Sequence, residues 1–210
     1  MKRIALAASL ALIAGVLWHG PAQAQNPPLL HRLIALSDDV HSYTASVHAD
    51  IAMRTFPYLT PQLDGIYYHK EPSKDKIVFT GGLPLIAAAF SNVYPHVESP
   101  ARWEEVYSIS TEANDGRTTT LKLVPRRTSR VNHIDAKIDD RSAELVQLRW
   151  NYNDDGGYAI LDQAYGRIEG HDLVTRQSGH LEIPHYTADL TSTFKDFKIN
   201  APIPDSVFSE

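Results

Sequence analysis

The sequence contains no cysteine, and its lysines and arginines form no cluster. Without cysteine the protein can have no disulfide bond, no thiolate metal site, no cysteine nucleophile and no lipid on an N-terminal cysteine. Its 20 basic residues are outnumbered by 25 acidic ones, which gives a formal net charge of −5. A net-acidic chain without a basic patch is a poor candidate for binding nucleic acid or an anionic membrane surface.

The chain is also neither very apolar nor very polar. Its 210 residues are 43% hydrophobic and 21% charged, which is too polar for a polytopic membrane protein and too apolar for a disordered one. This length fits one domain with a sizeable core.

Residues 1–24 have the pattern of a secretory signal peptide. Lys2 and Arg3 precede an uncharged apolar run from Ile4 to Trp18, and Ala22-Gln23-Ala24 supplies the small-x-small cleavage pattern. The alternative is a membrane anchor, but 15 residues are few for crossing about 30 Å of hydrocarbon. The sequence therefore predicts an exported, periplasmic domain over residues 25–210, with no transmembrane segment in the mature chain.

Processing gives the first testable expectation. The purified exported protein should begin at Gln25 and fractionate as soluble, and N-terminal sequencing measures this directly. An intact Met1 in washed membranes would contradict the prediction. Loss of Lys2 and Arg3 would leave 18 basic residues against 25 acidic ones, a net charge near −7.

Most of the remaining chain has the period-two pattern of strands. A helix predicted from Pro27 to Val40 is followed by alternation from Tyr43 to Met53, long enough to require a strongly twisted sheet. A hairpin is expected around Glu71-Pro72-Ser73, and a meander of strands after Arg102, with turns rich in Asn, Asp and Gly. The predicted fold is mainly β (α+β), a single antiparallel sheet curled around its apolar side.

Two features favour an apolar concavity over an ordinary core, although patterning alone leaves both possible. Alanines 45 and 49 face inward on the first long strand, which makes that face shallow. Pro84–Tyr94 is apolar almost all round, as expected of a helix that is fully buried or covers an apolar surface.

The sequence lacks the spacings that catalysis and metal binding usually require. No His-x-x-x-His, Gly-x-Ser-x-Gly or glycine-rich phosphate loop occurs. Gln177-Ser178-Gly179-His180 is interpreted as a hairpin tip. We therefore expect no cofactor, no metal and no enzymatic activity.

Three segments carry a family resemblance. Leu30–Leu33 with Val40–Ser46, the hairpin Gly65–Pro72 and the C-terminal Phe197–Phe208 together resemble the LolA/LolB superfamily of bacterial lipoprotein carriers and related periplasmic half-barrel proteins. The resemblance implies a half-barrel whose helices form a lid over an apolar cavity that takes lipoprotein acyl chains. Glu71 stands where the carriers have an arginine implied to latch the lid, and the absence of cysteine excludes an acylated receptor of the LolB type.

Together these observations predict a periplasmic, non-catalytic carrier of lipid or lipoprotein acyl chains, with envelope proteins as possible partners for hand-off. The alternatives are an envelope sensor or regulator that binds a partner protein, and an enzyme whose site has no recognised motif. The residues predicted to form the cavity wall and lid are Tyr43, Val47, Ile51, Met53, Tyr67, Ile86, Phe90, Val146, Leu148, Trp150 and Tyr152.

Overall fold

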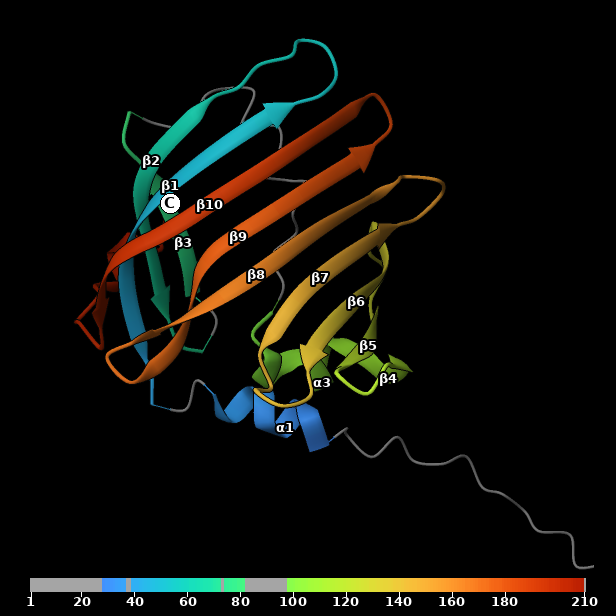
Figure 1. Cartoon of the computed structure of the whole chain (residues 1–210), viewed down its shortest axis with the longest axis horizontal. Helices are drawn as coiled ribbons and strands as arrows, with labels where there is room; N and C mark the ends of the chain where they lie inside the picture. Colours follow the sequence, from blue (N-terminus) through green and yellow to red (C-terminus); the bar gives the residue numbers. More distant parts are fainter. Residues whose placement is uncertain (1–27, 37–38, 73, 82–97, 210) are drawn as a thin grey trace, which may run out of the picture.

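The computed structural model describes residues 28–36, 39–72, 74–81 and 98–209. Ten antiparallel strands form one sheet in the order β3-β2-β1-β10-β9-β8-β7-β6-β5-β4, which curls without closing (Figure 1). The strands are β1 (Ser42–Met53), β2 (Gln62–Lys70), β3 (Lys74–Phe79), β4 (Tyr107–Asn114), β5 (Thr118–Pro125), β6 (Val131–Asp139), β7 (Leu145–Tyr152), β8 (Tyr158–Ile168), β9 (His171–Ile183) and β10 (Tyr186–Ile199). The helices are α1 (Pro28–Ala35) and α3 (Trp103–Val106), with 3₁₀ turns at Pro100–Arg102 and Asp205–Val207.

The predicted half-barrel is confirmed, as are the first long strand, the β2–β3 hairpin and the meander of β5, β6 and β7. The N-terminal helix ends at Ala35 rather than at Val40. The hairpin tip predicted at Gln177–His180 is wrong, because these residues lie in the middle of β9 and pair with both β8 and β10. The predicted helix Pro84–Tyr94 lies outside the described residues.

The curl of the sheet follows from long strands interrupted by bulges. The strands β1, β9 and β10 have 12, 13 and 14 residues, and right-handed twist accumulates along strands of this length. Register shifts interrupt the β1–β10 and β8–β9 pairings, and two more interrupt β6–β7. Each bulge adds local twist and bends its strand. One face of the sheet therefore becomes concave.

The helix α1 lies at one end of the concave side, where α3 also lies (Figure 1). Its Leu30 and Leu33 are buried in the core. The Arg32 guanidinium donates hydrogen bonds to the carbonyl oxygens of Asp140 and Arg141, at 2.9 and 2.7 Å. Apolar burial and this contact with the β6–β7 turn together fix α1 on the sheet.

Aspartates shape the hairpin turns as the sequence predicts. The Asp115 carboxylate accepts hydrogen bonds from the backbone N–H groups of Thr118 and Arg117, which lower its pKa to about 2. Asp139 accepts from the N–H groups of Arg141 and Ser142, and its pKa is lowered in the same way. A carboxylate that accepts several N–H bonds stays ionised and holds its turn closed at neutral pH.

The C-terminal segment returns to the β2–β3 hairpin. Asp205 accepts hydrogen bonds from Lys70 and Lys74 at 2.8 and 3.0 Å, and these two lysines lower its pKa to about 2. Lys70 also donates to the carbonyl oxygen of Ile203, whose side chain is buried. The end of the chain is thereby held against the hairpin.

Candidate functional site

The inward side chains of the sheet form separate groups. The largest contains residues of β4 to β9 together with Leu30 and Leu33 of α1 and Trp103 of α3. Leu148 and Trp150 are buried in this group, and Tyr152 packs against it. These three predicted site residues thus belong to the core that the two helices cover.

Val146 departs from the regular alternation predicted for its strand. The β6–β7 register shifts between Lys137 and Ile138, whose partners are Gln147 and Leu145. This bulge turns Leu145 into the core cluster, and Val146 is only half-buried. The predicted alternation is therefore wrong at Val146, because the sequence pattern does not reveal the extra residue.

The second group lies mainly on the neighbouring strands β1, β2 and β10, with Phe79 of β3 and Val174 of β9 packed against it. It combines two small clusters, one around Val47 and one around Ala49. We call it the β1 wall, and it consists of Ala45, Val47, Ala49, Ile51, Leu63, Tyr67, Leu190 and Phe194. The predicted site residues Val47, Ile51 and Tyr67 come together here, whereas Ile86 and Phe90 lie outside the described residues.

Tyr43 and Met53 lie at the two ends of the inward row of β1. Tyr43 packs against Tyr67 and Phe197, with ring centroids 5.6 and 5.9 Å apart. Met53 is buried opposite Ala188 of β10. The strand β1 therefore presents a continuous apolar row along its length.

Small residues make the β1 wall shallow. Val47 pairs with Gly65 on one side, and Ala49 pairs with Ser192 on the other. A Cβ atom on Gly65 would lie 2.6 Å from the carbonyl oxygen of Val78, so the close approach of β3 to β2 requires glycine at this position. The alanine, glycine and serine residues along the middle of the wall have short side chains or none. The side chains that project from the wall are therefore Val47, Ile51 and the aromatic rings.

A polar cluster lies at the Tyr43 end of the wall. Tyr67 Oη donates a hydrogen bond to Asp75, and His69 Nδ1 lies 2.8 Å from the same carboxylate oxygen. The rings of Tyr43 and His69 are 5.0 Å apart. Burial raises the pKa of both Tyr43 and Tyr67 above 10, so both phenols stay neutral. The cluster offers hydroxyl, imidazole and carboxylate groups beside an apolar surface.

Glu71 takes a local role at the turn between β2 and β3. Its carboxylate forms a 2.8 Å hydrogen bond with His41 Nδ1, and its backbone N–H donates to the carbonyl oxygen of His41. His41 directly precedes β1. Glu71 therefore fastens the hairpin to the start of β1.

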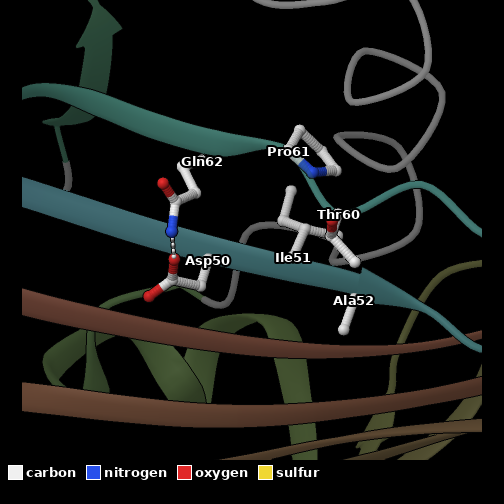
Figure 2. Close-up of a pocket in the computed structure, with 6 residues that line it drawn as sticks. All are labelled: Asp50, Ile51, Ala52, Thr60, Pro61 and Gln62. Atoms are coloured by element: carbon white, nitrogen blue, oxygen red, sulfur yellow. Dashed lines mark hydrogen bonds between the residues drawn. The ribbon is translucent and has the colours of Figure 1, made fainter.

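A pocket of about 440 Å³ opens at the opposite end of the wall, between β1 and the loop that leads to β2 (Figure 2). Ile51, Ala52 and Pro61 supply its apolar lining, and Gln62 donates a 2.9 Å hydrogen bond to Asp50 across it. Ile51 also belongs to the β1 wall. Ile51 is thus shared by the pocket and the β1 wall.

Three histidines of the described residues, His48, His69 and His180, pair with carboxylates of neighbouring strands. His48 lies 2.7 Å from Asp64, and His180 lies 2.7 Å from Asp189. Within the ranges that the structure describes, no three His, Asp or Glu side chains are grouped to hold a metal ion. In the same ranges, no helix has the length and apolar character needed to cross a membrane.

Comparison with known proteins shows which solved structures have a similar fold. No family model matches the sequence, and no curated protein matches it. Solved structures do match it. A DUF1329 family protein from Desulfovibrio piger has 12% identity and a TM-score of 0.61, over 86% of this chain and 94% of its own. A Vibrio parahaemolyticus domain proposed to sort outer membrane lipoproteins has 11% identity and a TM-score of 0.63, with the same two coverages.

A LolA superfamily protein from Nitrosomonas europaea has 12% identity and a TM-score of 0.55, over 87% of this chain and 96% of its own. The chain has a LolA-like fold. The match covers 94% and 96% of the lengths of the two LolA-like neighbours, so the likeness extends over the complete half-barrel. The family resemblance seen in the sequence is confirmed at the level of the fold.

Sequence reasoning missed the contribution of β10 to the wall of this LolA-like fold. Leu190 and Phe194 pair with Ile51 and Val47 and complete the wall. The period-two row Leu190, Ser192, Phe194 carries the signal that could have placed them. Their position beside β1 depends on the pairing of two strands that are far apart in sequence. The hydrophobic periodicity of one strand does not predict which strand pairs with it.

Proposed function

We propose that the protein is a periplasmic, non-catalytic carrier that binds acyl chains of lipids or lipoproteins along the β1 wall. The observation that carries the proposal is the continuous apolar row of β1, which has small residues beside it at Gly65 of β2 and Ser192 of β10. An acyl chain needs a long apolar surface of this kind. Each methylene that it buries contributes about 0.8 kcal/mol.

The rim pocket is the proposed entrance. Val47 and Ala49 are at most 5% exposed, so a ligand reaches them only when neighbouring side chains move apart. Ile51, Phe79 and Leu190 are half-buried over Ala49 and Leu63. Ile51 also lines the pocket, and a ligand entering there meets this half-buried residue of the wall first.

The fold supports this proposal. One of the solved structures with this fold belongs to a LolA superfamily protein, and another is a domain proposed to sort outer membrane lipoproteins. The signal-peptide pattern of residues 1–24 supports a periplasmic location. The non-catalytic role is proposed without a cofactor or metal.

Native mass spectrometry of the protein purified from its own envelope tests the proposal. We expect adducts with the masses of acyl-chain lipids or lipopeptides, lost on delipidation and restored by a fluorescent fatty-acid analogue. A protein that carries no such adduct and binds no analogue after delipidation contradicts the carrier function. A saturable protein partner in its place would favour the sensor or regulator.

A further inference from the structure

The loop between β1 and β2 carries large apolar side chains into solvent. Phe56 is 79% exposed, Tyr58 is 67% exposed and Leu59 is 44% exposed. We call these three residues the aromatic tip. Phe56 and Tyr58 are the two most exposed of the large hydrophobic residues that the structure describes.

The aromatic tip is held in place by hydrogen bonds. The ladder of the hairpin continues into the loop, because Ile51 N–H donates to Pro61 and Met53 N–H donates to Leu59. Tyr58 N–H closes the turn by donating to Thr55. The loop therefore presents its apolar side chains on a braced backbone instead of folding them inward.

The neighbouring hairpin supports the same loop. Arg54 N–H donates to the carbonyl oxygen of Thr187 at 2.7 Å, and Thr187 N–H donates to Thr55 Oγ1 at 3.1 Å. Tyr58 has a φ of +56°, a conformation that is unfavourable for a bulky residue. A strained, braced and exposed aromatic residue is a feature that a merely connecting loop does not need.

The charge around the tip differs from that of the whole chain. The net charge of the chain is −5, yet no acidic residue occurs between Met53 and Asp64 or between Ile183 and Asp189. The one arginine of the loop, Arg54, is paired with Asp189 at 2.6 Å. The loop itself is therefore apolar and carries no unpaired charge, and the acidic residue beside it in the rim pocket, Asp50, accepts a hydrogen bond from Gln62.

We infer that the aromatic tip is a docking site for a lipid bilayer surface, into which Phe56, Tyr58 and Leu59 insert. Phenylalanine, tyrosine and leucine are side chains that settle at the boundary between headgroups and acyl chains. The tip is at the end of the half-barrel opposite α1 and α3 (Figure 1). Thr60 and Pro61, which follow it directly, line the rim pocket. Docking would bring the proposed entrance to the membrane.

Co-sedimentation with phosphatidylcholine vesicles tests the inference. We expect the exported protein to bind, with little change between low and high salt. The double variant Phe56→Ser/Tyr58→Ser should weaken the partitioning about tenfold or more, because it removes most of the apolar surface that inserts. The matched control is Ile66→Ser/Val78→Ser, a cross-strand pair exposed by 44% and 46% on the β2–β3 hairpin. This control should bind as the unaltered protein does.

Equal loss in both double variants, or unchanged binding in the tip variant, would overturn the inference. So would a tip variant that changes only self-association in analytical ultracentrifugation, because the tip would then contact a second copy. Binding of the fatty-acid analogue without vesicles separates this inference from the carrier function. We expect the tip variant to retain it, and its loss in the tip variant with vesicle binding intact overturns the docking assignment.

Discussion

Replacing Ile51 with glutamate should abolish binding of a fluorescent fatty-acid analogue. Ile51 is half-buried among Ala49, Leu63 and Leu190 and lines the rim pocket. A carboxylate there would lie against the bound acyl chain without a partner, which costs several kcal/mol. At 1.4 kcal/mol per tenfold change, the affinity should fall by about a hundredfold or more. Fluorescence titration measures the loss.

Ser46→Glu is the matched control for this experiment. Ser46 lies on the same strand, is exposed on the opposite face, and pairs with Lys195 of β10. The same charge introduced there should leave the affinity unchanged. Circular dichroism verifies that both variants are folded. Equal loss in the two variants would show that the β1 wall is not the binding surface.

The largest loss of stability should come from Trp103→Ala. Trp103 is completely buried between α1 and the sheet, and its indole Nε1 donates a 2.6 Å hydrogen bond to the carbonyl oxygen of Glu98. Truncating a buried tryptophan lowers the free energy of unfolding by about 3–5 kcal/mol. For a chain of this size, this corresponds to a Tm lower by roughly 10 °C.

Thermal and urea denaturation measure this effect, and Val124→Ala provides the comparison. Val124 is 40% exposed on β5, so its truncation should change the free energy of unfolding by about 0.5 kcal/mol or less. Trp103 and the β1 wall belong to different clusters. At temperatures where Trp103→Ala is folded, its affinity for the fatty-acid analogue should therefore equal that of the unaltered protein. An unchanged Tm would contradict the assignment of Trp103 to the core.

The sequence was informative where local pattern decides structure. Alternation predicted β1 to within one residue, and the turn at Asn114-Asp115-Gly116 could be assigned because its side chains close it locally. The errors have a different origin. Ser178 and Gly179 suggest a turn by composition, but neighbouring strands on both sides pair with them and keep them extended in β9.

The division of the inner face could not be predicted for the same reason. Trp150 and Val47 have equivalent positions in alternating strands, and the sequence pattern predicts that both line one cavity. Their different surroundings depend on tertiary packing, because α1 and Trp103 cover Trp150, whereas Tyr67 and Phe194 surround Val47. Periodicity identifies which face of a strand is apolar, and it does not identify what covers that face.

The strand order has a consequence for how the chain reaches its native state. β1 is bonded to β10, with Tyr43 opposite Ile199, so in the described sheet the three N-terminal strands join the other seven only through the last strand. The contacts within β4–β9 are local in sequence and can form early, whereas the β1–β10 pairing closes a very long loop. Until β10 is in place, the apolar row of β1 has an unpaired edge that can aggregate. Deleting β10 would therefore separate β1–β3 from an otherwise intact meander, and it would also remove Leu190 and Phe194 from the β1 wall.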